Sequence, residues 1–240
     1  LNYLIERKLI NKSNYIITLT NESKKIIIDN YKYKHNKIEV IPTCVNIDNF
    51  KYINKKYENK INFCFLGSLN KAYDFIEMTN FVHNISKKNK NYFFYFYIKY
   101  NNNYLFNLLQ DKNINKNRYL IKFINTDDVS KYLDNIDFGF FFLKKNTSIK
   151  ASFPTKIAEY LSKGIPIVCN NFNSDIEDII SNKQLGILID YKNIDYNKLT
   201  NKINFLVNNE NINKICREYA ENNLSINYGC NKYLEVYDKI

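Results

Sequence analysis

A lysine and a glutamate three residues apart, Lys156 and Glu159, are the pair in the sequence that most clearly suggests chemistry. At about 100° per residue, Thr155, Lys156 and Glu159 fall on one side of a helix. A lysine can contact phosphate oxygens as a point charge, and a carboxylate can accept hydrogen bonds from ribose hydroxyls. The same pair could be a surface ion pair worth a few tenths of a kcal/mol. Spacing alone leaves both interpretations open.

Ser152 and Pro154 predict where the helix that carries this pair begins. Ser152 is a good N-cap, because a serine side chain can accept a hydrogen bond from a free N–H of the first turn. Pro154 suits the first turn, where its missing N–H costs no hydrogen bond. Further along, Gly164 fits the left-handed residue that ends a helix, and Pro166 enforces the stop. Taken alone, Gly164 and Pro166 indicate only a change from helix to strand.

A glycine turn over 67–71 is the second candidate site, because it directly follows the apolar run 61–66. Gly67 lets the backbone approach a ligand closely, and the start of the next helix offers free N–H groups to a phosphate. Ser68 lies beside the glycine, and Lys71 would add a full positive charge. A strand-glycine-helix turn is also common as a purely structural feature, so this motif leaves both readings open.

These candidate sites lie within a regular alternation of apolar runs and amphipathic segments. Strands are expected over 15–19, 38–41, 61–66, 92–98, 119–124, 138–143, 166–169 and 186–189. Helices are expected over 3–10, 20–31, 75–85, 104–109, 129–133, 155–161 and 176–180, with three more to the C-terminus. Asp127 is expected to cap the helix over 129–133, and the polar stretch 51–60 is a candidate linker.

Strands that are apolar throughout and separated by amphipathic helices indicate a parallel sheet that is buried on both faces. The predicted fold class is therefore α/β, with a doubly wound parallel sheet of the Rossmann-like kind. In such sheets ligands bind beyond the carboxyl ends of the strands. The residues that follow each strand are therefore the first place to look for chemistry.

Composition and charge narrow the class of protein. The chain has 240 residues, of which 45% are hydrophobic and 16% aromatic, as in a globular protein. The net charge of +11 favours anionic partners such as nucleotide diphosphates, an anionic membrane surface or nucleic acid, but the basic residues are scattered and equally suit a solvated surface. No zinc-finger spacing or RNA-recognition signature is present, so nucleic-acid binding is not expected.

The five cysteines indicate neither a disulfide framework nor a zinc site, because they are far apart and include no CxxC pair. We therefore expect no metal. No apolar stretch of about 18 residues is present, so no membrane span is expected. The chain starts with Leu1 inside a helical pattern, which we interpret as a partial chain.

Four stretches taken together resemble the C-terminal domain of family 4 glycosyltransferases. Residues 41–46 with Phe50 resemble the family's "IPNGVD…F" junction, and residues 65–69 resemble its "GxL" turn. Residues 152–159 and 164–168 resemble "SxxxxxxE…GxPVV". A subset of polysaccharide-assembly enzymes carries "GSLG…Y" and "SSPTKxxEYLxxGxPV", to which residues 67–73 and 152–168 are similar.

The resemblance implies one half of a GT-B fold, in which two Rossmann-like domains enclose the substrates. Residues 1–45 would be the end of the N-terminal, acceptor-side domain. Residues 46–225 would form the nucleotide-sugar donor-binding domain. Residues 226–240 would form the helix that crosses back to the N-terminal domain.

The resemblance also implies roles for individual residues. Glu159 would bind the donor ribose, Gly67, Ser68 and Lys156 would lie near the diphosphate, and the backbone over 123–126 would flank the base. With Lys71, Ser152 and Thr155, these residues make up the expected donor-binding set. No catalytic residue is identified, and no cofactor is expected because the nucleoside diphosphate sugar is the donor substrate.

Two departures from the family pattern bear on the donor contacts. The family often has a second glutamate eight positions before Glu159, where this sequence has Ala151, and its usual arginine after the glycine is Ser68. Lys150 is expected to supply positive charge nearby.

The resemblance implies a retaining glycosyltransferase of the hexosyltransferase type. It would move a sugar from a nucleoside diphosphate sugar to a glycan or lipid-linked acceptor in surface polysaccharide assembly. The alternatives are a GT-B sugar-nucleotide epimerase and a non-catalytic nucleotide-sugar-binding partner subunit. The expected location is cytoplasmic, with peripheral contact at the inner face of the membrane as a further expectation.

Overall fold

The computed structural model describes residues 2–53, 55, 57, 60–100, 103–125 and 129–240. Its main element is a six-stranded sheet in the order β5-β4-β3-β6-β7-β8, in which every described pairing is parallel. The strands are β3 (Ile61–Gly67), β4 (Tyr92–Ile98), β5 (Tyr119–Phe123), β6 (Phe138–Phe141), β7 (Ile167–Asn170) and β8 (Gly186–Ile189). The α/β class and the parallel sheet predicted from the sequence are confirmed.

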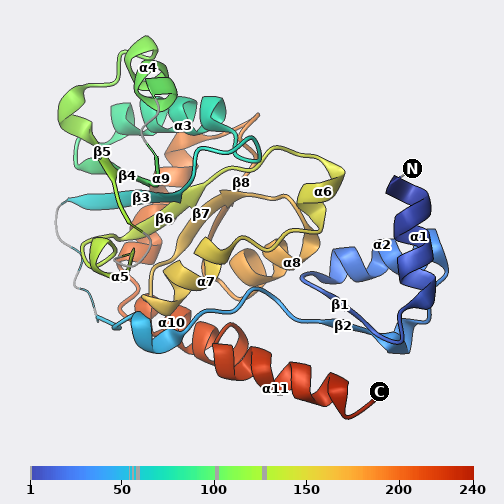
Figure 1. The fold of residues 1–240 in the computed structure, drawn as a ribbon. Helices are drawn as coiled ribbons and strands as arrows, with labels where there is room; N and C mark the ends of the chain where they lie inside the picture. Colours follow the sequence, from blue (N-terminus) through green and yellow to red (C-terminus); the bar gives the residue numbers. More distant parts are fainter. Residues whose placement is uncertain (1, 54, 56, 58–59, 101–102, 126–128) are drawn as a thin grey trace.

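Helices cover both faces of this sheet, as a doubly wound fold requires (Figure 1). One face carries α3 (Phe75–Lys88), α4 (Asn103–Asp111) and α9 (Tyr196–Val207). The other carries α5 (Val129–Tyr132), α7 (Thr155–Ser162), α8 (Ser174–Glu177) and α10 (Ile212–Asn223). The short helix α6 (Thr147–Lys150) precedes α7, and α11 (Ile226–Tyr237) follows α10. None of the described helices is long and apolar enough to cross a membrane.

The N-terminal residues form a separate small unit (Figure 1). It consists of α1 (Asn2–Lys12), β1 (Ile16–Thr18), α2 (Asn21–Tyr31) and β2 (Ile38–Val40). The two strands pair in parallel with each other and do not join the six-stranded sheet. From this unit the chain crosses to the larger domain, and α11 returns toward the unit at the end of the chain.

The candidate linker over 51–60 is bound to the larger domain along the part that the structure describes. Arg217 donates a hydrogen bond of 2.7 Å to the carbonyl of Phe50, and Lys163 donates one of 2.8 Å to the carbonyl of Lys51. Lys55 donates to a backbone carbonyl just after α5. Lys163 and Lys55 therefore attach this segment to the larger domain, and Arg217 attaches the residue just before it, whereas its polar sequence had suggested a linker.

Aromatic packing in the central strands explains why these apolar runs form the middle of the sheet. Phe63 of β3 stacks on Phe94 of β4 at 5.2 Å and on Phe138 of β6 at 5.3 Å between ring centroids. All three rings are fully buried. Stacked rings of this kind contribute about 0.5–1.5 kcal/mol per pair beyond the apolar area that they bury. These contacts hold β4, β3 and β6 together in the middle of the sheet.

Some element boundaries differ from the sequence prediction. Strand β6 ends at Phe141 rather than 143, because Leu143 forms an antiparallel bridge with Tyr73 and donates its N–H to the side chain of Asn170. The helix expected over 176–180 is α8 followed by a π-helical turn over 178–182. The predicted cap at Asp127 lies outside the described residues.

Helix α7 lies very close to β6 because residue 139 is a glycine. A Cβ atom on Gly139 would be 2.3 Å from the ring of Tyr160, which is fully buried. Real Cβ contacts are not that short, so a side chain at this position would push α7 away from the sheet. Gly139 therefore sets the distance between the helix and the strand.

We expect Gly139→Ala to lower the free energy of unfolding by about 1–3 kcal/mol, because the added methyl group overpacks the contact with Tyr160. Urea denaturation followed by circular dichroism measures the change. In a Tyr160→Leu background the same substitution should cost clearly less, since the ring that it meets is gone. An equal loss in both backgrounds would contradict this explanation.

Candidate functional site

A cavity of about 310 Å³ opens at the carboxyl ends of β3 and β4, beside the first turn of α7. Five of the residues expected to bind a ligand line it together: Gly67, Ser68, Thr155, Lys156 and Glu159. The glycine turn and the helix are about ninety residues apart in the sequence, and the parallel sheet brings them to one edge. We call this space the α7 cavity.

Two of the expected residues, Lys71 and Ser152, do not line the cavity. Lys71 is exposed, and the carbonyl of the next residue, Ala72, accepts a hydrogen bond of 2.9 Å from the N–H of Lys144 in the segment after β6. The Ser152 hydroxyl donates to the carbonyl of Ile149 at 2.8 Å and completes the turn after α6.

The predicted N-cap at Ser152 is wrong. Helix α7 begins at Thr155, and its N-cap is Pro154, which has extended backbone angles and forms no side-chain cap. A proline at this position leaves the first free N–H groups of the helix to Thr155 and Lys156. Both residues line the α7 cavity.

Lys156 is buried, with only 4% of the residue exposed. Its ammonium nitrogen lies 3.9 Å from the ring centroids of both Phe65 and Tyr73, and 5.3 Å from that of Phe141. It has no hydrogen-bond partner among the described residues. Burial lowers the pKa of this amine to about 7, against the opposing effect of Glu159. Aromatic rings hold the cation in place but provide no counter-charge.

Glu159 lies one turn further along α7 and is partly buried. Burial raises the pKa of its carboxyl group, while the positive charges of Lys156 and Lys99 lower it. The ammonium group of Lys156 does not hydrogen-bond to this carboxylate. The structure therefore excludes the simple surface ion pair that the spacing allowed. Both groups face a shared cavity instead.

Tyr160 fixes the position of both charged residues. Its hydroxyl donates to the carbonyl of Cys64 at 2.8 Å and accepts from the N–H of Leu66 at 2.9 Å. The pairing between β3 and β6 ends at Cys64 and Gly139. Beyond that point the phenol hydroxyl of Tyr160 forms the hydrogen bonds to β3 that a neighbouring strand would otherwise form. A buried side chain of α7 thus bonds directly to the strand that ends in the glycine turn. The sequence analysis placed Tyr160 in the helix without recognising this contact.

Six residues outside the expected donor-binding set also line the α7 cavity: Leu66, Tyr73, Tyr97, Lys99, Ile124 and Val129. Tyr97 and Lys99 flank the last residue of β4, and Ile124 directly follows β5. The rule that ligands bind after parallel strands would have pointed to these positions. Ile124 also falls within the segment 123–126 that was expected to flank a base, of which Thr126 lies outside the described residues.

The cavity thus combines a polar end and an apolar end. Lys156, Ser68 and the backbone at Gly67 offer positive charge and hydrogen-bond donors, whereas Tyr97, Ile124 and Val129 offer apolar surface. Among the residues that the structure describes, no group of three His, Cys, Asp or Glu side chains is placed to hold a metal ion. The arrangement suits a ligand that carries an anionic group and a flat apolar group.

Comparison with known protein families identifies the domain that carries this cavity. The family model described as glycosyl transferases group 1 matches residues 46–223. The chain belongs to this family. Both sides of the α7 cavity lie within the matched part, so the cavity is a feature of the group 1 glycosyltransferase domain. No curated protein sequence gives a significant match.

Solved structures with the same fold include several glycosyltransferases. A glycosyltransferase from Rickettsia africae superposes with a TM-score of 0.77 at 18% identity, over 97% of this chain and 66% of the other. Anabaena Alr3699/HepE in complex with UDP and glucose gives 0.76 at 13%, over 100% and 67%. Staphylococcus aureus TarM in complex with Fondaparinux, alpha-GlcNAc-glycerol and UDP gives 0.72 at 18%, over 98% and 46%.

These similarities establish the fold of the group 1 glycosyltransferase chain. Identities of 12–18% support a shared architecture and no finer likeness. The chain spans 66% of the length of the Rickettsia protein and about half of the length of TarM. The GT-B fold and the family inferred from the sequence are confirmed.

We expect Lys156→Met to raise the free energy of unfolding near pH 7 by about 1–4 kcal/mol, because it removes an unpaired buried cation. The folded pKa of about 7 is below the ordinary value of 10.5, so between these values the unfolded chain binds more protons. The penalty that Lys156 imposes is therefore greatest below pH 7 and shrinks as the pH rises toward 10.5.

Urea denaturation at pH 6.5 and pH 10 measures this difference, with the exposed Lys71→Met as the matched control that changes stability by less than about 0.5 kcal/mol. A gain from Lys156→Met that is the same at both pH values would argue against the buried ammonium group.

Proposed function

We propose that the α7 cavity binds a nucleoside diphosphate sugar and that the protein takes part in transferring the sugar to a glycan or lipid-linked acceptor. One observation carries this proposal. The ammonium group of Lys156 is buried beside the glycine turn with no partner among the described residues. A buried cation without a counter-charge is costly unless a ligand supplies one.

The polar end of the cavity suits the diphosphate. A Cβ atom on Gly67 would lie 3.1 Å from the ammonium nitrogen of Lys156, and Gly67 has φ of +144°. Glycine at this position therefore leaves space above the lysine that a larger residue would fill. The first N–H groups of α7, at Thr155 and Lys156, add the partial positive charge of a helix N-terminus.

The remaining walls suit the nucleoside. The carboxylate of Glu159 lies one turn from Lys156 and can accept hydrogen bonds from both ribose hydroxyls. Beyond it, Tyr97, Ile124 and Val129 provide apolar surface against which a base can pack. Ribose lies between phosphate and base in a nucleotide, and Glu159 and the apolar wall line the same cavity as Lys156.

In the transfer step, the bond between the anomeric carbon of the sugar and the diphosphate oxygen breaks, and its electron pair stays with the diphosphate. The acceptor hydroxyl oxygen forms the new bond to the anomeric carbon, and its proton passes to an oxygen of the leaving diphosphate. Lys156 and the α7 N-terminus would stabilise the charge that develops on the leaving group. We propose retention of configuration, with no protein nucleophile assigned. The nucleotide sugar is a substrate here, and the proposal includes no cofactor.

The two positions at which this sequence departs from the family pattern determine which residue we assign to the diphosphate. Lys150, expected to supply charge near the donor, lines a different cavity, where its ammonium group lies 3.8 Å from the carboxylate of Glu22. Ser68 lines the α7 cavity in place of the family's arginine. We therefore assign the diphosphate contact mainly to Lys156, which approaches from the helix side.

We further propose that residues 1–45 belong to the acceptor-side domain, 46–225 to the donor domain and 226–240 to a crossing helix. The separate two-stranded sheet supports the first boundary. The start of α11 supports the second boundary. There the N–H of Val45 donates to the carbonyl of Leu224, and the N–H of Ile226 donates to the carbonyl of Val45, each at 2.9 Å. HepE in complex with UDP-glucose, and WaaG, involved in lipopolysaccharide biosynthesis, have the same fold and support the proposal of a donor sugar nucleotide and of a role in polysaccharide assembly.

We expect Lys156→Ala to weaken UDP or GDP binding about 10–100-fold, because it removes a charged hydrogen-bond donor worth about 1.5–3 kcal/mol. Glu159→Ala should weaken it about tenfold through the loss of the ribose contact. Isothermal titration calorimetry measures both, with Lys71→Ala as a matched control that should stay within about twofold. Unchanged affinity in both variants would refute the proposed site.

We also expect UDP affinity to fall as the pH rises above 7. The pKa of Lys156 in the free protein is about 7, so above this pH binding must first restore its proton. The expected decrease is up to about tenfold per pH unit. Titrations from pH 7 to 9 avoid the phosphate ionisation near about pH 6. The slope should disappear in Lys156→Ala, and a slope that persists there would assign the pH dependence to another group.

A further inference from the structure

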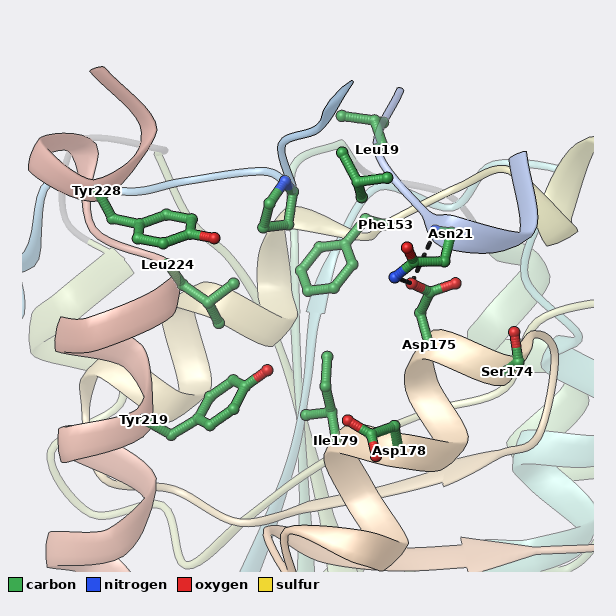
Figure 2. Close-up of a pocket in the computed structure, with 12 residues that line it drawn as sticks. Leu19, Asn21, Phe153, Ser174, Asp175, Asp178, Ile179, Tyr219, Leu224 and Tyr228 are labelled. Carbon is green, nitrogen blue, oxygen red and sulfur yellow. Dashed lines mark hydrogen bonds between the residues drawn. The ribbon is translucent and has the colours of Figure 1, made fainter. Parts of the chain in front are cut away.

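A second cavity, of about 290 Å³, lies where the N-terminal unit, the larger domain and α11 meet (Figure 2). We call it the junction cavity. The N-terminal unit lines it with Leu19 and Asn21, the larger domain with Phe153 and Asp178, and α11 with Tyr228. It shares no lining residue with the α7 cavity. Its volume is near the lower limit of about 300 Å³ for small-molecule sites.

Polar atoms point into the junction cavity from opposite walls. Figure 2 shows the hydroxyls of Tyr219 and Tyr228 directed inward from α10 and α11, and the carboxylate of Asp178 on the opposite wall. Neither hydroxyl has a hydrogen-bond partner among the described residues, and Asp178 uses one oxygen to accept from Asn182 at 3.0 Å. Burial raises the pKa of Tyr219 to about 12, so its hydroxyl keeps its proton and can both donate and accept.

The rest of the lining combines the polar residues Asn21, Ser174 and Asp175 with apolar side chains, and it carries no positive charge. Phe153, Ile179 and Leu224 are each buried and present ring and aliphatic surface to the cavity. None of the described lining residues is Lys, Arg or His. The α7 cavity, in contrast, is lined by Lys99 and Lys156. The junction cavity therefore does not favour a phosphate group.

The walls are held together without a ligand. Asp175 accepts hydrogen bonds of 2.8 Å from the N–H of Asn21 and 3.1 Å from the N–H of Glu22, and so caps α2 across the junction (Figure 2). Thr43 adds a bond of 2.8 Å to the carbonyl of Phe153. A site whose walls are already fixed loses little ordering entropy when it binds.

From these features we propose that the junction cavity is a second carbohydrate site, which binds one neutral sugar unit. A sugar ring has an apolar face, which packs on Phe153 and Leu224, and hydroxyls, which bond to Tyr219, Tyr228 and Asp178. This site goes beyond the proposed transfer reaction, because it needs no nucleotide. An occupant contacts the N-terminal unit, the larger domain and α11 at once, and so couples sugar binding to their arrangement.

Saturation-transfer NMR tests the site with three probes: methyl α-glucoside, methyl α-galactoside and N-acetylglucosamine. Saturating UDP is present throughout to occupy the α7 cavity. We expect at least one sugar to bind with a dissociation constant on the order of millimolar. Absence of transfer to all three sugars would overturn the proposal. So would binding of the diamine putrescine alone, which would indicate that the cavity selects cations through Asp178.

Matched variants locate the sugar. Leu19→Trp fills the cavity from an exposed position and should abolish sugar binding, whereas Leu120→Trp, on the edge strand β5, should not. The two leucines are 42% and 43% exposed, so neither substitution disturbs the core. Tyr219→Phe and Tyr228→Phe should each weaken binding about threefold to tenfold. Sugar binding that survives Leu19→Trp would place the sugar elsewhere.

The α7 cavity is tested separately by Glu159→Ala. This variant should bind UDP about tenfold more weakly and still bind the sugar when measured without nucleotide. Loss of sugar binding together with UDP binding would assign the sugar to the α7 cavity and overturn the second site. The two proposals can therefore fail independently.

Discussion

The hydroxyl of Tyr160 bonds to both backbone groups at the end of β3, and the geometry of the α7 cavity depends on this contact. The backbone N–H and carbonyl groups of a buried strand need hydrogen-bond partners along its whole length. Here β6 stops pairing with β3 at Gly139. The phenol satisfies the backbone groups that would otherwise be left unpaired in a buried position. Because the same residue belongs to α7, the helix and the glycine turn have a fixed separation.

That fixed separation holds Lys156 in an environment that stability alone would not select. Its ammonium group lies against two aromatic rings, and burial brings its pKa down to about 7. An unpaired buried cation lowers stability, and such local conflicts are expected where a ligand binds. Glu159 stays near enough to influence the pKa of the lysine without neutralising it through a hydrogen bond.

A different contact organises the junction between the two units. Asp175 caps the N-terminus of α2 from the opposite side of the boundary, where the partial positive charge of a helix end favours a carboxylate. The α7 cavity and the junction cavity lie on either side of the segment before α7, since Phe153 lines one and Thr155 the other. The two cavities differ in charge, which suits them to different ligands.

The sequence by itself determined the order of the elements and the parallel sheet. It also determined the turn at Gly67 and the helix that carries Glu159. Apolar periodicity and the position of a glycine can be recognised from a few neighbouring residues. The sequence could not determine that Lys156 is buried, that Lys71 points away, that Ser152 is not the cap, or that Tyr160 and Lys99 belong near the site. These outcomes depend on how strands about thirty to ninety residues apart pack against α7. Burial and contact between distant segments are properties of the packed sheet, and only the tertiary structure decided them.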